Sequence, residues 1–420
     1  RENVLLQSNN FGTTWFNSST TQTSGQSGYN ETNNAWLLSK SASNAYLGQN
    51  ISVSGVHTIS VYAKAGSLNW ILILGLGSNS ASQYFDVQNG ISGGGGGTGY
   101  VDGSITSVGG GWYRCNVVLN STSNQYRIYP AQADGDQSGT SGSIYIQSAQ
   151  VETGLVATDY LNSTSVTAKA GVLIDLPRIN YDANGENGAL LLEPSRQQLI
   201  QFSEYIGASY WTKTNATITD NATTSPEGVV NASALTENTS TSTHFMISQL
   251  VPASASTYYS ASYFVKYNGR HFQILGSTGS EGGGYVNFDL INGEVGNSDQ
   301  LTGSIESLGN GWYRCTGTNI STSSATEIRL LPYLCTNPTS SRAESYLGDG
   351  TSGVYIWGAQ IEPNASYATS YIPNHSGTGG VTRAADSCLG AGDVDSINSV
   401  EGVLYWEGSF DSTSTTAGAI

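Results

Sequence analysis

The sequence has little charge, little proline and almost no methionine. Only 11% of its 420 residues are Asp, Glu, Lys or Arg, against about 25% in an ordinary globular domain. It contains 9 Pro and 1 Met, but 52 Gly and 25 Tyr. The polar surface therefore has to come from Ser, Thr, Asn, Gln and Gly, which favours half-buried sheets and tight turns over helices. Disorder is disfavoured, because 8 Trp and 38% hydrophobic residues exceed what a solvated coil carries.

Positive charge is also scarce. The chain has 15 Lys and Arg against 31 Asp and Glu, a formal net charge of -16. A nucleic-acid backbone needs neutralising Lys and Arg, so this balance disfavours nucleic acid and, equally, an anionic lipid surface. No run approaches the roughly 18 apolar residues of a membrane span, and WILILGLG (70–77) predicts a buried strand. We therefore expect neither nucleic acid nor membrane as a partner.

Cysteine and histidine are few and dispersed. The four Cys (115, 315, 335 and 388) are too scattered for a disulfide scaffold, and there is no CxxC. The four His show no metal-ligand spacing. The sequence starts RENVLL, without Met or a signal peptide, and stops at TTAGAI after a strand-like run, so we expect an excerpt of a longer protein.

An internal repeat organises the chain. GWYRC occurs at 111–115 and at 311–315, YFDVQNG (84–90) matches NFDLING (287–293), and GSIYIQSAQVETG (142–154) matches SGVYIWGAQIEPN (352–364). YRIYP (126–130) likewise matches IRLLP (328–332). The offset between matching blocks drifts, so insertions fall between blocks, as they do in loops. The chain therefore contains two copies of one domain.

Each copy has the local pattern of β-structure. HTISVYAKA (57–65) alternates apolar and polar residues with a period of two, and both FDxxNG blocks place Asn-Gly between strand-like runs, a strong hairpin signal. We predict an all-β protein with two tandem antiparallel β-sandwich, jelly-roll-like domains. The expected boundaries are module 1 at 1–169, a connecting hairpin at 170–197, module 2 at 198–385 and the start of a truncated third domain at 386–420.

Several blocks in order resemble a family. PRINYDANGENGALLLEPSRQQLIQFSEYIGASYW (177–211), the GxYIWGAQIE strand and TSYIPNHSGTGGVTRAAD (369–386) resemble modules of bacteriophage tail-fibre and head-spike proteins. EGVLYWEGSF (401–410) resembles the start of a concanavalin-like sandwich domain. The resemblance implies carbohydrate-binding-like jelly rolls, a place on the virion surface and, by analogy with fibres, a homo-oligomer with a trimer favoured. Copy one departs from the pattern, with Ser148 where copy two has Trp357, and AKAGVL instead of TRAADS.

Residues that occupy equivalent positions in both copies are expected to be required by the fold. We expect Trp15, Trp112, Trp211 and Trp312 in the cores, because aromatic side chains dominate core energetics. We expect the motif arginines, Arg114 and Arg314, and the paired arginines of the next strand, Arg127 and Arg329, to form structural ion pairs. The carboxylate partners expected for them are Asp86 and Asp289, or Glu152 and Glu362. A catalytic interpretation would need two carboxylates facing a cleft, and the sequence gives no sign of one, so we expect no enzyme.

Ligand contacts are instead expected where the copies differ. Aromatic side chains flanked by polar ones suit the apolar faces and hydroxyl rims of sugars. The candidate glycan-binding residues are Trp36, Tyr46 and Trp70 in copy one, and His271, Phe272 and Tyr285 in copy two. Core positions remain the alternative interpretation for each of them.

Two acidic turns and the cysteines complete the candidates. ADGDQSG (133–139) and LGDGTSG (347–353) place Asp134, Asp136 and Asp349 where oxygen ligands could hold a structural Ca²⁺, although an ordinary turn is the stronger interpretation. No other cofactor is expected. Cys115 should be a free, buried, small apolar side chain, and a bridge between Cys315 and Cys335 is left open.

Three functions are compatible with these patterns. The favoured one is a non-enzymatic virion appendage that attaches to a host-surface glycan and contacts other virion proteins. The second is a set of binding modules from a secreted bacterial adhesin or polysaccharide-degrading enzyme. The third is a purely structural spacer.

Overall fold

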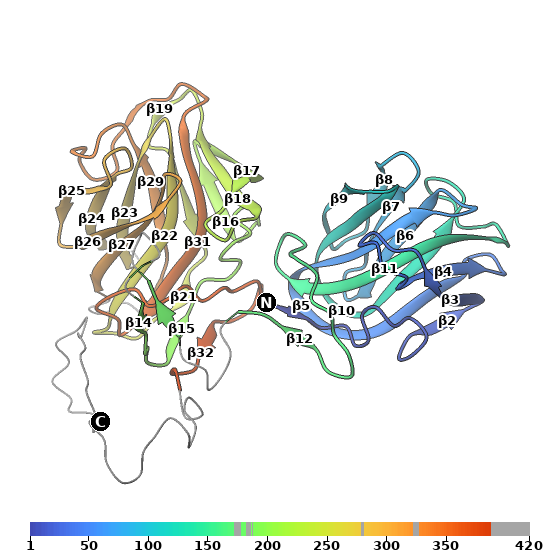
Figure 1. Ribbon diagram of the computed structural model, residues 1–420. Coiled ribbons are helices and arrows are strands. Elements are labelled where there is room, and N and C mark those ends of the chain that lie inside the picture. The colour runs from blue at the N-terminus through green and yellow to red at the C-terminus, as the bar shows by residue number, and fades with distance from the viewer. Residues whose placement is uncertain (172–177, 182–185, 187, 279–280, 322–326, 388–420) are drawn as a thin grey trace, which may run out of the picture.

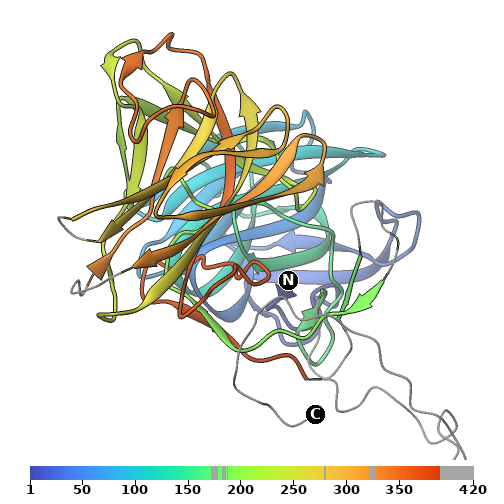
Figure 2. The same ribbon diagram turned by 90° about the vertical axis from the view of Figure 1, so that its left-hand side faces the viewer.

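A computed structural model describes residues 1–171, 178–181, 186, 188–278, 281–321 and 327–387. In these ranges the protein is all-β, its named strands pair antiparallel, and no helix occurs. Two bodies lie side by side, with the N-terminus between them (Figure 1). In the view turned by 90°, the body formed by the second half of the chain lies in front of the first (Figure 2). The predicted all-β class with antiparallel sheets is therefore confirmed, while the expected third domain at 386–420 lies outside the described residues from 388 onward.

The first body, module 1, is built from one ten-stranded sheet and a short pair. The pair is β1 (Glu2–Asn3) with β12 (Ala168–Lys169). The sheet consists of β2 (Phe16–Ser18), β3 (Thr20–Gln26), β4 (Ala35–Lys40), β5 (Tyr46–Ala65), β6 (Trp70–Gly77), β7 (Ala81–Asp86), β8 (Ile91–Gly96), β9 (Tyr100–Gly109), β10 (Trp112–Ala131) and β11 (Gly142–Thr153).

Two long strands make this single sheet into two layers. β5 and β10 are each 20 residues long and pair with each other along most of their length. The second half of β5 and the first half of β10 continue into β11, β4, β3 and β9, which we call layer A. Their other halves continue into β2, β6, β7 and β8, which we call layer B.

The second body, module 2, repeats both layers as separate six-stranded sheets. Layer A consists of β17 (Ala216–Thr224), β18 (Val230–Glu237), β31 (Gly353–Pro363), β22 (Tyr258–Asn268), β27 (Trp312–Ser321) and β26 (Thr302–Gly309). Layer B consists of β16 (Trp211–Thr214), β20 (Phe245–Ser248), β29 (Leu331–Cys335), β23 (His271–Thr278), β24 (Glu281–Asp289) and β25 (Glu294–Asp299). Four short pairs complete the body and its connector: β13 (Ile179–Asn180) with β14 (Ala189–Leu190), β15 (Arg196–Gln198) with β32 (Val381–Arg383), β19 (Thr241–Ser242) with β30 (Tyr346–Leu347), and β21 (Val251–Pro252) with β28 (Glu327–Ile328).

The main core of each module lies between its layers. In module 1 it contains Trp15 and Cys115, and in module 2 Trp211 and Cys315. Alternate residues of each strand point inward, as the two-residue period predicts. The expectation of a core position is confirmed for Trp15 and Trp211.

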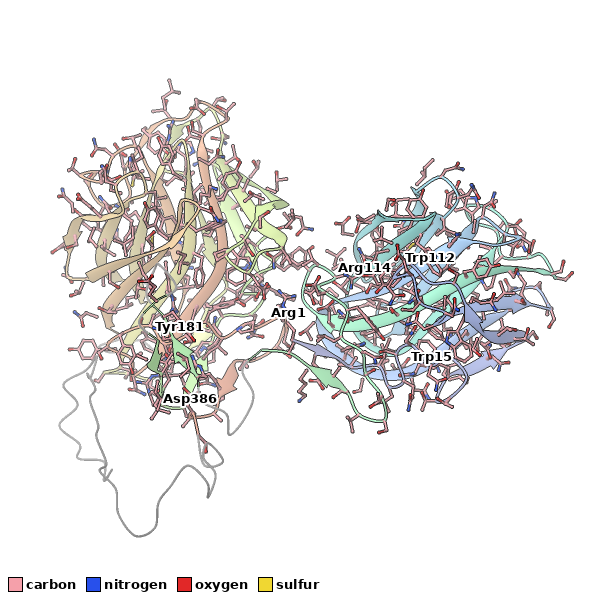
Figure 3. All side chains as sticks on the ribbon, viewed as in Figure 1. Arg1, Trp15, Trp112, Arg114, Tyr181 and Asp386 are labelled. Carbon is pink, nitrogen blue, oxygen red and sulfur yellow. The ribbon has the colours of Figure 1, made fainter. Side chains whose placement is uncertain are left out.

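The motif tryptophans lie elsewhere. Trp112 is buried on the outer side of layer A, in a satellite cluster with Ala35, Tyr62 and Tyr29. Trp312 occupies the same place in module 2, beside Phe264 and Trp357. Because Cys115 points into the main core three residues along the same strand, Trp112 has to point outward. Both tryptophans are buried as expected, but in a second cluster that covers the back of the sheet. Figure 3 shows Trp112 and Arg114 close together and apart from Trp15.

The closing segment of each module is held by the same Gln and Glu. In module 1, Glu152 accepts hydrogen bonds from the N–H and hydroxyl of Thr158, and Gln150 accepts one from the N–H of Leu161. In module 2, Glu362 binds Thr369 and Gln360 binds Ile372 in the same way. This shared contact explains why AQVE and AQIE recur with ATDYL and ATSYI.

Candidate binding face of the first module

The outer side of layer B in module 1 carries aromatic side chains: Phe16, Tyr46 and Tyr84 are half-buried, whereas Tyr129 and the adjacent Leu72 are buried, at 6% and 4% exposure. Leu47 and Ile128 point into the core, so their neighbours Tyr46 and Tyr129 point outward. Tyr129 pairs with Leu72, and Leu72 pairs with Tyr84 of β7. These four outward residues form one row across four strands. We call the outer side around this row the aromatic face.

A second row runs beside the first. Phe16 of β2 pairs with Gly48, which pairs with Arg127, which pairs with Leu74. A Cβ on Gly48 would lie 2.9 Å from two carbons of the Phe16 ring. Glycine is thus what allows the Phe16 ring to lie over the sheet at this point.

The rings and one guanidinium are packed together. The Tyr46 centroid lies 5.2 Å from that of Tyr129 and 6.2 Å from that of Phe16, with the Phe16 ring edge-on at 89°. The Arg127 Cζ lies 4.2 Å from the centroid of the Tyr46 ring, within cation–π range. Phe16, Tyr46 and Arg127 are all half-buried, so each keeps atoms in contact with solvent.

Arg127 is oriented by its own strand. Its Nε and Nη2 donate to Gln125 Oε1 at 3.0 and 2.6 Å, and its Nη1 donates to the Tyr129 hydroxyl at 3.3 Å. A guanidinium has five N–H donors, so donors remain for a ligand after these bonds. The planar group is therefore held in place beside an aromatic ring and can still bind an oxygen-rich molecule.

A loop borders the aromatic face at Tyr84. The Tyr84 hydroxyl donates to Gln137 Oε1, and burial raises the pKa of this phenol above its ordinary value. Lys40 Nζ donates to the Gln137 carbonyl at 2.8 Å and to the Pro130 carbonyl at 3.2 Å. Residues 132–141 are thereby held at one edge of the face.

The equivalent face of module 2 is covered. Pairing places Phe245 and Tyr333 where module 1 has Tyr46 and Tyr129, and their rings stack at 4.3 Å. Gln273 and Asn287 stand where module 1 has Leu72 and Tyr84. Both amides are fully buried. They bind the segment that follows β29.

The covering segment is held by backbone contacts. Gln273 donates to the Ser341 carbonyl at 3.1 Å and accepts from the Ala343 N–H at 2.8 Å. Asn287 donates to the carbonyls of Pro338 and Ser340 at 3.0 and 2.7 Å. Leu72 has no polar group and Tyr84 donates to the Gln137 side chain, so module 1 lacks the pair of buried amides that holds the covering segment in module 2.

The register also corrects the alignment of the copies. In module 1 Ile128 pairs with Ile73, whereas in module 2 Pro332 pairs with Ile274, the residue equivalent to Ile73. The strand of module 2 is therefore shifted by two residues relative to the match of YRIYP with IRLLP. Leu331, and not Arg329, takes the place of Arg127. Arg127 is thus specific to module 1.

The sequence-predicted binding residues of module 1 separate in the structure. Tyr46 lies on the aromatic face. The ring of Trp70 lies against Gly93 of β8, because a Cβ there would be 2.6 Å from Trp70 Cζ3. Trp36 packs on the core edge, 6.1 Å from the Phe11 ring, and donates its indole N–H to the Asn9 carbonyl at 2.9 Å. The three predicted residues therefore do not form one site.

Of the sequence-predicted binding residues of module 2, two are buried and one is half-buried. Phe272 is fully buried in the main core, which corrects its place among ligand-contacting residues. His271 is buried beside Asp289 and accepts from the Leu290 N–H at 3.3 Å, and burial lowers the pKa of its imidazole. Tyr285 is half-buried on β24.

The carboxylates of the acidic turns accept backbone N–H groups, from their own turn at Asp136 and Asp349 and from β8 at Asp134. Asp134 accepts the Gly94 N–H, Asp136 accepts the Ser138 N–H, and Asp349 accepts the N–H groups of Thr351 and Ser352. Over the ranges that the structure describes, no group of three His, Cys, Asp or Glu is placed to hold a metal ion. The turn interpretation accounts for these carboxylates, and the Ca²⁺ stays a prediction.

The motif arginines bind carbonyls and hydroxyls, which corrects the expected ion pairs. Arg114 donates to Ser60 Oγ at 3.3 Å, and Arg314 donates to Ser262 Oγ and to the Thr369 carbonyl at 3.1 and 2.6 Å. Each guanidinium also lies over a ring of the satellite cluster, Tyr62 or Phe264. The expected acids have other partners. Asp86 and Asp289 accept hydrogen bonds from the backbone N–H groups of Asn89 and Asn292 in the two FDxxNG turns.

The three cysteines in the described part of the chain form no disulfide. Cys115, Cys315 and Cys335 are all free and buried, so the bridge left open between Cys315 and Cys335 does not form. Burial raises the pKa of each thiol, which keeps it protonated and unreactive. Cys388 lies outside the described residues.

No protein-family model and no curated protein matches this chain. In the described part of the chain, no helix is long and apolar enough to cross a membrane.

Proposed function

We propose that the chain is a non-enzymatic segment of a virion appendage. In it, module 1 binds a host-surface glycan, and module 2, whose equivalent face is covered, serves as a spacer. The observation that carries the glycan-binding part is the aromatic face, where Phe16, Tyr46 and Arg127 stay accessible. The placement on a virion rests on the resemblance of the sequence blocks.

The chemistry of the aromatic face suits a sugar. Ring faces and edges of Phe16 and Tyr46 offer an apolar surface for the C–H side of a pyranose. Arg127 and Gln125 offer donors and an amide for hydroxyl or carboxylate oxygens. The strands beneath hold these groups in place before a ligand arrives, which lowers the entropy lost on binding.

The contrast between the modules supports one site per chain. In module 2 the equivalent position of Arg127 is Leu331 and that of Phe16 is Thr212, while two buried amides hold a covering segment over the sheet. A single weak site per chain would gain strength from multiple copies, since avidity can exceed a single affinity by about 10²–10⁴. A homo-oligomer, with a trimer as the fibre analogy suggests, would supply those copies.

A glycan array tests the proposal. The chain should be multimerised on beads or streptavidin and applied as wild type, Tyr46→Ala and Arg127→Ala. We expect the wild type to bind a defined set of glycans. Both variants should lose at least about tenfold in affinity, which corresponds to a loss of about 1.4 kcal/mol of binding free energy.

A matched control lies in the other module. Phe245→Ala changes the equivalent ring on the covered face and should leave binding unchanged, with thermal unfolding recorded for every variant. Loss in Phe245→Ala equal to that in Tyr46→Ala would place the site elsewhere. Absence of binding by the multimerised wild type would leave the chain as a spacer or as part of a secreted bacterial protein with another ligand.

A further inference from the structure

Arg127 brings a positive charge to the aromatic face without a carboxylate partner. Arg178 and Arg383 each form an ion pair with a carboxylate. Within the described ranges no ion pair includes Arg127, so the one expected for it does not form there. Its hydrogen bonds go to the uncharged side chains of Gln125 and Tyr129. A ligand with a negative charge could therefore take the place that a carboxylate of the chain takes elsewhere.

The positions around Arg127 on the outer side of layer B are uncharged. Arg127 pairs with Gly48 on one neighbouring strand and with Leu74 on the other. Two residues along β10, Gln125 pairs with Asn50, which is exposed. Leu74 and Gln125 are half-buried. A ligand that reaches the guanidinium thus meets apolar and amide groups at these positions, and Arg127 is the charge that it meets first.

The guanidinium is held with part of its edge free. The Tyr46 ring covers one of its faces, 4.2 Å from Cζ. Three of its five N–H groups donate to Gln125 and Tyr129, so two remain. Carboxylate oxygens accept hydrogen bonds in the plane of a guanidinium, and these charge-assisted bonds are stronger than those to a neutral hydroxyl. The remaining donors therefore favour a carboxylate over a hydroxyl.

The loop that borders the aromatic face at Tyr84 is negatively charged. Burial raises the pKa of the Tyr84 phenol, and the carboxylates of Asp134 and Asp136 add to this rise, so both lie near enough to act on it. A second negative charge in the ligand would meet repulsion on this side. The face is thus suited to one negative charge at Arg127 and to uncharged groups toward the loop.

The net charge of the chain acts only weakly at this place. The value of -16 is spread over 420 residues. At physiological ionic strength, exposed charges that lie more than about 8 Å apart are largely screened. The charges closest to the ligand then decide which ligand is preferred.

We propose that the ligand of the aromatic face is an acidic glycan in which one sugar carries a carboxylate and its neighbours are uncharged. This inference rests on the proposed function and names the class of ligand for the same site. The carboxylate accepts the free N–H groups of Arg127, while the apolar side of the sugar lies on Phe16 and Tyr46. The uncharged sugars extend toward Tyr84.

A glycan array built from matched pairs tests the class of ligand. Each pair contains an acidic glycan and the same glycan with its carboxyl reduced to an alcohol; sulfate esters and a polyuronate are added. We expect the multimerised wild type to bind the carboxylate member at least about tenfold more tightly, because a charge-assisted hydrogen bond becomes a neutral one. The polyuronate should bind more weakly than a glycan with one acidic sugar, because its further carboxylates face Asp134 and Asp136.

Two variants assign the preference to Arg127. In Arg127→Gln, both members of a pair should bind with the same weak affinity, because the charge is lost. Arg329→Gln is the matched control, since Arg329 is half-buried in module 2 and Leu331 takes the place equivalent to Arg127. The control should keep the full preference, and thermal unfolding shows that both variants are folded.

The other outcomes decide against the inference. Equal binding of both pair members by the wild type, together with loss in Tyr46→Ala, would overturn it and leave the proposed function in place. A carboxylate preference that survives in Arg127→Gln would place the carboxylate elsewhere. Tighter binding of the sulfate esters or of the polyuronate would overturn the single carboxylate. If the wild type binds no glycan at all, the proposed function fails and this inference fails with it.

Discussion

Trp112 and Trp312 show how one residue type serves two clusters in the same fold. Trp15 and Trp211 fill the space between the layers, whereas the motif tryptophans cover the outer side of layer A. In module 1 the cover continues with Tyr29, whose ring stacks on Tyr62 at 3.9 Å. The arginine that follows in the motif lies over the same ring. GWYRC thus packs both sides of one sheet, with its Trp and Arg outward and its Cys inward.

Replacing Trp112 by Ala should destabilise module 1 without affecting module 2. The side chain is 3% exposed, and loss of a buried Trp typically costs about 3–5 kcal/mol. The outer cluster can partly collapse toward solvent, so we expect the lower end, about 3 kcal/mol. Urea unfolding followed by tryptophan fluorescence measures this, with Trp312→Ala as the converse variant. If the urea-unfolding transition of module 1 were unchanged in Trp112→Ala, the satellite cluster would contribute nothing to the stability of that module.

At the scale of elements, the repeated blocks predicted the strands well. FDxxNG marks a hairpin in both modules because its Asp accepts two backbone N–H groups of the turn, at 2.9 and 3.1 Å in each copy. Such local contacts are readable from sequence. The position of β29 could not be predicted from the sequence, because a shift of the strand by two residues keeps every side chain on its original side of the sheet. The alternation pattern is the same before and after the shift.

The aromatic face was predicted only in part. Tyr46 was among the candidate residues, but Phe16, Arg127 and Tyr129 were not. Phe16 belongs to a three-residue strand, too short for a periodic signal, and Arg127 had been paired with Arg329 as a structural residue. Cross-strand pairing, which joins residues far apart in sequence, is what brings these side chains together.

Exchanging two residues should open the second face. Gln273→Leu/Asn287→Tyr gives module 2 the residues of module 1 at the places that bind the covering segment. The Ser341 and Ser340 carbonyls and the Ala343 N–H would lose their partners, so amides of residues 337–344 should exchange faster while the layers stay folded. Hydrogen exchange measures this directly. The control is Gln300→Leu, because Gln300 is exposed directly after β25 and its side chain contacts Asp299. Full protection in the double variant would mean that other contacts hold the segment.

At the scale of the whole molecule, a joint holds the two modules together. Val56, Val118 and Leu155 of module 1 form a cluster with Phe202 and Tyr205 of module 2. The N–H of Val56 donates to the His375 carbonyl at 3.0 Å. Arg1, which lies between the modules in Figure 3, forms ion pairs with Glu227 of module 2 and, at 3.8 Å, with Glu152 of module 1. The apolar packing, the backbone hydrogen bond and the ion pairs together favour a rigid arrangement of the two modules over modules that move independently.

Gly55 is the residue at which this joint can be broken selectively. Its φ is +86°, and a Cβ there would lie 2.4 Å from the His375 carbonyl oxygen, so no larger residue fits while the modules are docked. We expect Gly55→Leu to separate the modules and increase the radius of gyration measured by small-angle X-ray scattering. Gly109→Leu is the matched control, because Gly109 has a similar φ of +92° but no atom within 4 Å of a built Cβ. Both variants carry the backbone strain, about 1–3 kcal/mol, but only the first meets the other module. Identical scattering from the two variants would show that the modules do not depend on this contact for their arrangement.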